Sequence, residues 1–353
     1  MKAKWPNAMS GQVQVLPQTI NFVLPDDRHL PSGGNLYNEK LIQALLQLGQ
    51  SVEIMSFPEY HKVIQADKAG IYGVDSLFVE EMHKLLKYSP KKAFSFFIMH
   101  HLQSLFPPKG IDAEQYFLQA EAPVLRFFDV FLLTSEFSKA YLLEKKMEGH
   151  MMVVEPAYSV VDVPSSSLSK PLKAIMVANV VERKGILSFL EQLAYLSKAE
   201  DDFMINIIGR TDMEPAYYQS CQKLVQSSSL KSKVHFSGEM EHHEVLQQYS
   251  LHHLFVSAAQ METFGMAIQE AKSCGLPLLL CKGGFTERHL LKGKGLISPN
   301  IFKLAGNFIE LCRNDRLMRE YWQSAKVART SSQPYQWEQA AAFFLNLFRD
   351  FYI

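Results

Sequence analysis

Two carboxylates, Glu262 and Glu270, stand eight residues apart on either side of a short Phe264-Gly265 turn. An apolar run precedes them and a Gly-Leu-Pro sequence follows, which is typical of a strand, a turn and a helix. A helix that begins at Gly265 carries Glu270 one to two turns from its N-terminus and leaves Glu262 in the preceding loop. Its first N–H groups, from Phe264 to Met266, would bind phosphate, and carboxylates bind hydroxyl groups. The segment therefore predicts a site for a nucleotide sugar.

Two glutamates at this spacing also occur by chance on solvated helix faces, so the surrounding residues decide the interpretation. The segment resembles the E-x7-E motif of retaining glycosyltransferases with the GT-B fold, in family four, also called glycosyl transferases group 1. The matching positions, all in one frame, are Ser257, Glu262, Phe264, Gly265, Glu270, Ala271, Gly275, Pro277, Gly283, Gly284 and Glu287.

The resemblance implies transfer of a hexose-type sugar from a nucleoside diphosphate donor to an acceptor hydroxyl, with retention of configuration. Glu262 would hold sugar hydroxyls and stabilise the positive ring of an oxocarbenium-like transition state. Glu270 would bind the ribose. Charge also builds on the leaving diphosphate, so the reaction would depend on positioning and on electrostatic stabilisation. No cofactor is expected beyond the donor substrate itself.

Two cations follow the first expected strand of the second half, in the sequence Arg183-Lys184-Gly185. Such a pair can neutralise a diphosphate, although an exposed pair at a helix start is the commoner case. The family pattern is Gly-Arg-x-x-x-x-Lys-Gly, and Lys184-Gly185 matches its end. Asn179 stands where the family has arginine, which puts the two-cation clamp in doubt. Arg183 is a candidate to compensate.

Three other positions complete the candidate site. Gly33 and Gly34 lie between the first expected strand and helix, where glycines allow a phosphate or sugar to approach the backbone. His100 directly follows an apolar strand and matches a family histidine near the donor sugar; His101 is nearly as good a candidate, and a structural histidine is the alternative. Gly209 matches the first glycine of a Gly-x-Gly turn that contacts the nucleotide.

The composition excludes several classes of protein. The 353 residues are 47% hydrophobic and 20% charged, and Lys plus Arg equals Asp plus Glu at 36 each. A net charge of zero argues against a general nucleic-acid binder. No Asp-x-Asp sequence and no histidine pair with a third ligand at metal spacing occurs, so no metal is expected.

The four cysteines, none in a Cys-x-x-Cys pair, favour reduced thiols and a cytoplasmic location. No window of about 18 uncharged apolar residues and no signal peptide is present, so we expect a soluble chain. A peripheral contact with a membrane surface stays open.

Strand-like and helix-like runs alternate throughout, which predicts an α/β fold of two Rossmann-like, doubly wound parallel sheets that face a cleft. We expect an N-terminal acceptor domain at residues 1–158, joined by the C-terminal helix 335–353, and a C-terminal donor domain at 171–334. The first set of strands is expected at residues 19–24, 51–55, 94–99, 130–134 and 151–154, with a helix at 35–48. The second is expected at 172–178, 203–208, 234–236, 254–257 and 278–280, with a helix at 186–196. Residues 156–171 read as a linker, and residues 59–90 are not placed.

The sequence leaves the nucleotide base, the donor sugar and the acceptor open, and the acceptor could be a glycan, a lipid or a small molecule. Another GT-B sugar-nucleotide enzyme, such as an epimerase or a phosphorylase, is one alternative function. A catalytically weak homologue that binds a sugar nucleotide or a partner is another, and the asparagine at position 179 keeps it open.

Overall fold

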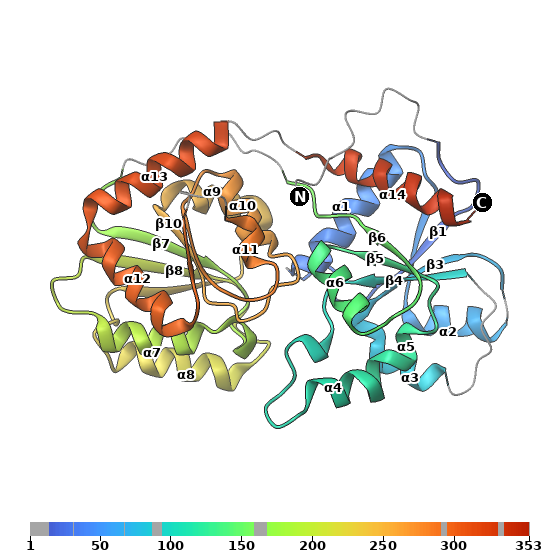
Figure 1. Ribbon diagram of the computed structural model, residues 1–353, viewed down its shortest axis with the longest axis horizontal. Helices are drawn as coiled ribbons and strands as arrows, with labels where there is room; N and C mark the ends of the chain where they lie inside the picture. The colour runs from blue at the N-terminus through green and yellow to red at the C-terminus, as the bar shows by residue number, and fades with distance from the viewer. Residues whose placement is uncertain are drawn as a thin grey trace.

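The computed structural model describes residues 14–30, 32–66, 68–86, 94–158, 168–290, 295–330 and 335–352. Two six-stranded sheets lie side by side, each covered by helices (Figure 1). All pairs of neighbouring strands within them are parallel. The predicted α/β fold with two doubly wound sheets is therefore confirmed.

The strands of each sheet are ordered around a central crossover. The first sheet runs β2 (Val52–Met55), β1 (Ile20–Val23), β3 (Ile71–Asp75), β4 (Phe94–Met99), β5 (Val130–Leu133) and β6 (His150–Val153). The second runs β12 (Gly295–Ser298), β11 (Leu278–Cys281), β10 (Leu254–Ser257), β7 (Leu172–Val177), β8 (Phe203–Ile208) and β9 (Val234–Gly238). In such sheets ligands bind beyond the carboxyl ends of strands near the point where the order reverses, which is at β1 and β3 in the first sheet and at β7 and β10 in the second.

The helices connect the strands and cover the sheets (Figure 1). Those of the first half are α1 (Gly33–Gln47), α2 (Phe57–Gln65), α3 (Val79–Leu85), α4 (Ala113–Tyr116), α5 (Ala122–Leu125) and α6 (Glu136–Glu144). Those that follow are α7 (Ile186–Leu196), α8 (Pro215–Gln226), α9 (His242–Leu251), α10 (Met266–Ser273), α11 (Thr286–His289), α12 (Ile301–Arg313), α13 (Asp315–Thr330) and α14 (Trp337–Tyr352). Among the described residues, no helix has the length and apolar character that a bilayer crossing needs.

Three elements differ from the expectations. Strand β3 lies in the segment that could not be placed, because its five fully buried residues include Gly73 and Asp75 and do not form an apolar run. Gly73 packs under the Phe96 ring, where a Cβ atom would come within 2.3 Å of it. Strand β12 was also missed. Helix α1 begins at Gly33, not at Asn35, because Ser32 caps it and accepts a hydrogen bond from the Asn35 N–H at 3.0 Å.

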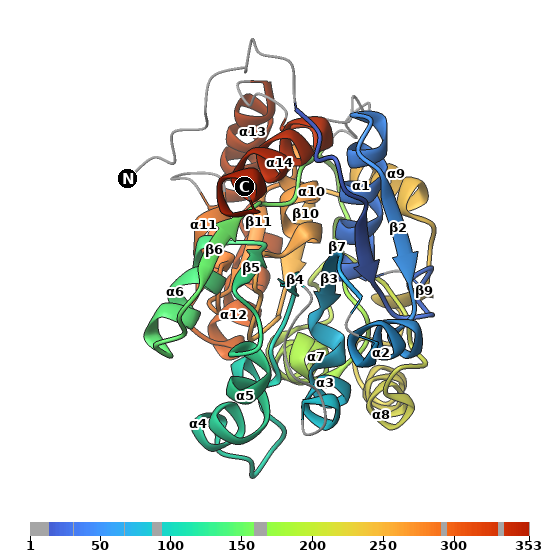
Figure 2. The same cartoon turned by 90° about the vertical axis from the view of Figure 1, so that its right-hand side faces the viewer.

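The last helix, α14, packs against α1 and β6 of the first sheet (Figure 2). Its Phe344 and Phe348 are fully buried and contact the ring of Phe96 at centroid distances of 5.9 and 5.2 Å. The chain thus passes between the two sheets twice. Residues 159–167 and 331–334 of these passages lie outside the described residues. At their described ends, Tyr158 donates its N–H to the Tyr335 carbonyl at 2.9 Å.

We predict that Phe344→Ala lowers the free energy of unfolding by about 3–5 kcal/mol, because it removes a fully buried ring and leaves a cavity. Phe302 of α12 is 52% exposed, and Phe302→Ala should change stability by less than about 0.5 kcal/mol. Denaturant unfolding of both variants measures this. Equal stabilities would show that α14 does not belong to the packed core of the first sheet.

Candidate active site

Lys184 and Glu262, two of the predicted site residues, form a partly buried ion pair. Lys184 ends a short 3-10 turn before α7, and Glu262 lies in the loop from β10 to α10. Lys184 Nζ lies 2.5 Å from Glu262 Oε1, and each side chain is 14% exposed. Burial alone would raise the pKa of Glu262, but the charges of Lys184 and Arg183 outweigh it and hold that pKa below its usual value. Burial lowers the pKa of Lys184, which the Glu262 carboxylate partly offsets.

Glycines allow the loops that carry this pair to approach each other. Gly185 has φ +66°, and a Cβ atom there would come within 2.3 Å of the Ala258 carbonyl oxygen. Gly284 has φ +59°, and its Cβ would come within 2.1 Å of the Glu262 carbonyl oxygen. That carbonyl also accepts the Phe285 N–H at 2.7 Å. The backbone of Gly283, Gly284 and Phe285 thus packs directly against the loop that carries Glu262.

The same loop joins the two halves of the molecule, through Thr263. The Thr263 hydroxyl donates to the His100 carbonyl at 2.7 Å. The Ser135 hydroxyl, at the start of α6, donates to the Thr263 carbonyl at 2.5 Å. We call this region, where residues 258–266 meet the ends of β4 and β5, the domain junction.

The two neighbouring histidines after β4 face different surroundings. The His100 ring lies 2.9 Å from the Asn38 side-chain oxygen and 3.5 Å from Asp75, and burial lowers its pKa while Asp75 partly offsets this. It is therefore held by the first domain. Burial and the charges of Arg183 and Lys184 lower the pKa of His101 to about 4. His101 thus faces the cations of the candidate site.

The N-terminus of α10 is open, as the phosphate hypothesis requires. Gly265 precedes the helix with φ +89°, and no side chain caps the helix. Phe264 is stacked on Phe285 at a centroid distance of 5.4 Å, and its carbonyl lies 2.5 Å from His289 Nε2. The first N–H groups of α10 are therefore held in place without a side-chain partner.

Gly33 and Gly34, the first two residues of α1, border the domain junction. Met266 packs against the core of the first domain, and a Cβ atom on Gly33 would lie 3.8 Å from its sulfur. A Cβ atom on Gly34 would lie 3.1 Å from the His100 ring. Both glycines are in the first turn of α1, not in a loop before it as the sequence suggested. They still border the residues at the start of α10.

The second glutamate of the motif does not contact the Lys184–Glu262 pair. Glu270 Oε1 lies 2.9 Å from His242 Nε2, and Glu270 Oε2 accepts a hydrogen bond from the Tyr249 hydroxyl at 3.2 Å. Both partners belong to α9. Glu270 therefore lies one helix turn or more beyond the open N-terminus of α10, between α10 and α9.

Asn179, where the family pattern has arginine, lies at the carboxyl end of β7. Its side-chain oxygen accepts the Arg210 N–H at 3.1 Å, and its side-chain nitrogen lies 3.3 Å from the Met213 sulfur. The Arg210 guanidinium pairs with Asp212 at 3.0 Å and lies 3.7 Å from Glu239. Gly209 approaches the Ala178 carbonyl, to which a Cβ atom would be 2.2 Å distant.

Sequence reasoning missed four residues that the structure brings to this region: Ser135, Thr263, Arg210 and His242. Thr263 lies inside the recognised motif, and its position beside Glu262 was the only signal for it. Arg210 follows the predicted Gly209. Ser135 and His242 form hydrogen bonds to residues far away in the sequence, which no local spacing reveals.

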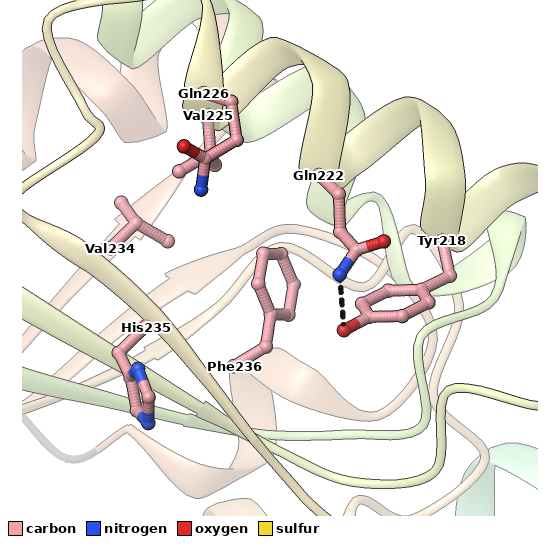
Figure 3. Close-up of a pocket in the computed structure, with 7 residues that line it drawn as sticks. All are labelled: Tyr218, Gln222, Val225, Gln226, Val234, His235 and Phe236. Carbon is pink, nitrogen blue, oxygen red and sulfur yellow. Dashed lines mark hydrogen bonds between the residues drawn. The ribbon is translucent and has the colours of Figure 1, made fainter.

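The described residues offer a pocket away from the domain junction but no cluster of metal ligands. No group of three or more His, Cys, Asp or Glu side chains among the described residues could hold a metal ion. A shallow pocket opens between α8 and β9 (Figure 3). Its lining residues are Tyr218, Gln222, Val225, Gln226, Val234, His235 and Phe236. They lie away from the domain junction and carry no carboxylate or primary amine.

Two parallel-sheet domains with these strand orders define the GT-B class of glycosyltransferase folds. The model of the family described as "Glycosyl transferases group 1" matches residues 162–327. This segment, which covers most of the second domain, therefore matches the glycosyl transferases group 1 family.

Three individual proteins are similar to this chain in sequence or in structure. The sulfoquinovosyl transferase SQD2 of Arabidopsis thaliana is 25% identical over 185 residues, which are 51% of this chain and 34% of that protein. The sucrose-phosphate synthase of Thermosynechococcus elongatus superposes with a TM-score of 0.76 at 17% identity, over 94% of this chain and 98% of that one. The Anabaena protein HepE, in complex with UDP and glucose, has a TM-score of 0.71 at 16% identity, over 94% and 100%. These structural similarities show a shared fold.

The histidine under the α10 loop makes a prediction about pH. Burial lowers the pKa of His289 to about 4, whereas an unfolded histidine titrates near about 6.5. The folded state therefore binds this proton more weakly. The contribution of His289 to the free energy of unfolding is therefore fully present above about pH 6.5. It decreases as the pH drops toward 4, by about 2 kcal/mol at pH 5.

Urea unfolding at about pH 7 and pH 5 tests this, with His289→Gln beside the unchanged chain. The variant should lose less stability on acidification, although not zero, because His101 titrates in the same window. Identical losses in both proteins would contradict the prediction.

Proposed function

We propose that this protein transfers a hexose-type sugar from a nucleoside diphosphate donor to an acceptor hydroxyl, with retention of configuration. The observation that carries the proposal is the partly buried Lys184–Glu262 pair beside the uncapped N-terminus of α10. A cation, a carboxylate and free N–H groups in one place suit a ligand with both phosphates and hydroxyls.

In this proposal, different residues bind different parts of the donor. Lys184 and the N–H groups of Phe264, Gly265 and Met266 bind the diphosphate and stabilise its charge as it leaves. Glu262 binds sugar hydroxyls and stabilises the positive ring. Arg183 adds positive charge to the same loop.

Residues of both domains surround the remaining parts of the donor. Glu270 binds the ribose, and Gly209 with Asn179 borders the nucleotide from the ends of β8 and β7. Gly33 and Gly34 let donor and acceptor approach α1. His100 is the proposed contact to the donor sugar, and the position of His101 opposite Arg183 and Lys184 makes it an equal candidate for that contact.

The identity of the donor draws support from relatives. HepE has a crystal structure in complex with UDP-glucose, and the pneumococcal O-GlcNAc transferase GtfA has one in complex with UDP and GlcNAc. UDP-hexoses are therefore the first donors to test. We propose that the reaction uses no metal or other cofactor and takes place in the cytoplasm. The acceptor, whether glycan, lipid or small molecule, would enter from the first domain.

A second candidate function is binding of a sugar nucleotide without turnover. The observation that favours it is Asn179, a neutral side chain where the family pattern has arginine. Hydrolysis of the donor, or transfer from it, separates the two functions. A binding protein would be stabilised by the nucleotide and would release no free sugar.

A melting-temperature panel with UDP, GDP, ADP and TDP, each with and without an attached sugar, tests the proposed donor class. A ligand at 100 times its dissociation constant stabilises the folded state by about 2.7 kcal/mol, which a melt detects. A shift with one nucleotide would support the donor site and identify the base. No shift with any nucleotide would contradict the proposal.

We predict that Glu262→Gln reduces sugar transfer by at least about 100-fold, because it removes the negative charge opposite the developing positive ring. Transfer of radiolabelled sugar measures this, and circular dichroism checks the fold, since the change leaves Lys184 without its charged partner. Glu310→Gln, on the exposed side of α12, is the matched control. A Glu262→Gln enzyme with full activity would disprove the assigned role.

We predict that Lys184→Ala weakens donor binding about 10- to 100-fold, which corresponds to the loss of a hydrogen bond to a charged group. Calorimetric titration with the nucleotide from the panel measures the affinity. Lys303→Ala, at an exposed lysine on α12, should bind as the unchanged protein does. Unchanged affinity in Lys184→Ala would place the phosphates elsewhere.

A further inference from the structure

The carboxylate of Glu270 is held from one side by α9. Tyr249 is fully buried, and burial raises its pKa well above the usual value, so its hydroxyl keeps the proton that it donates to Glu270 Oε2. His242 Nε2 lies 2.9 Å from the other oxygen. The Glu270 side chain is 15% exposed and the His242 ring is 40% exposed. The pair is therefore open to a ligand although the carboxylate is fixed.

His242 is itself fixed by the way α9 begins. It is the first residue of the helix, and Glu241 and Glu244 form a capping box that sets the start of the helix. Across the domain junction, Glu39 and Lys40 of α1 are close enough to influence its charge. Figure 2 shows α1 in front of α9 in this region. The imidazole thus contacts Glu270 and lies near enough to α1 of the first domain for Lys40 and Glu39 to act on its charge.

We propose that His242 is a positioning residue for the donor ribose, which orients Glu270 and makes donor binding depend on pH. This inference rests on the proposed function, because it takes Glu270 as the ribose ligand. The family resemblance supplied a role for Glu270 but none for His242.

The number of acceptor positions supports this role. A carboxylate offers about four lone-pair positions, two on each oxygen. Tyr249 and His242 each use one, on different oxygens, so one position remains free on each oxygen. The two neighbouring hydroxyls of a ribose can donate to these two positions together. The arrangement therefore prepares Glu270 for a vicinal diol before the donor arrives.

The charge of His242 sets the direction of the pH effect. The hydrogen bond that His242 donates to the Glu270 carboxylate raises the pKa of His242. Burial opposes this, and Lys40 and Glu39 act with opposite signs. The charged imidazole holds Glu270 more strongly and attracts the anionic donor. Because the proton favours binding, donor affinity should be highest below this raised pKa and should fall as the pH rises through it.

Calorimetric titration with UDP-glucose at about pH 6 and about pH 8.5 tests the inference. UDP-glucose is preferable to UDP, because a terminal phosphate titrates near pH 6 whereas the sugar diphosphate does not. For the unchanged protein we expect affinity to fall about three- to tenfold between the two pH values.

Three variants complete the experiment. His242→Ala should bind about tenfold more weakly at pH 6 and lose the pH dependence. His242→Gln keeps an amide donor at a similar reach but does not titrate, so it should bind better than His242→Ala with a flat pH profile. His243→Ala changes the next residue, which is exposed, and should behave as the unchanged protein.

The outcomes distinguish failure of the proposed His242 role from failure of the proposed donor site. If His242→Gln keeps the pH dependence, or His242→Ala binds as tightly as the unchanged protein, the positioning role is wrong and the donor site stands. If the unchanged protein does not bind UDP-glucose at either pH, the proposed donor fails and the inference fails with it.

Discussion

The partly buried pair of Lys184 and Glu262 is the constraint on which the rest of the site depends. Moving either charge from water into the protein costs several kcal/mol, and the contact between the two, with the nearby charge of Arg183, offsets part of that cost. The loops after β7, β10 and β11 come together around the pair. Gly185 and Gly284 stand where a Cβ atom would collide with the backbone of the β10 loop. These positions are restricted to glycine, and the charged site is thereby held in a fixed place.

The same pair explains how a donor could be recognised. Within the described residues, Lys184 and Glu262 form a direct ion pair with each other, and Arg183 adds positive charge beside Glu262. A diphosphate offers Lys184 a second anion, and sugar hydroxyls offer Glu262 new donors, so a donor replaces contacts that already exist. Because Thr263, next to Glu262, bonds to His100 and Ser135 of the first domain, the positions of the two domains are coupled to this loop. The site is thus complete only where both domains meet.

The fold followed from the sequence because its signals are local, and the candidate site residues were found from local motifs. The alternation of strands and helices predicted two parallel sheets, and the segment from Ser257 to Glu287 predicted a strand, an open helix start and two carboxylates. Strand β3 escaped because burial on both faces and Gly73 removed its pattern. The roles of Ser135 and His242 escaped for another reason. Ser135 contacts a residue 128 positions away in the sequence, and His242 contacts one 28 positions away. A single sequence does not indicate which of its distant residues are in contact.

A crystal structure of the protein with the nucleotide sugar that gives the largest melting shift tests the central claim most directly. We predict that the diphosphate lies within hydrogen-bond distance of Lys184 Nζ and of the first N–H groups of α10, and that the ribose contacts Glu270. A nucleotide bound elsewhere, for example in the pocket between α8 and β9, would contradict it. So would a nucleotide at the domain junction that leaves the Lys184–Glu262 contact and the α10 N-terminus untouched.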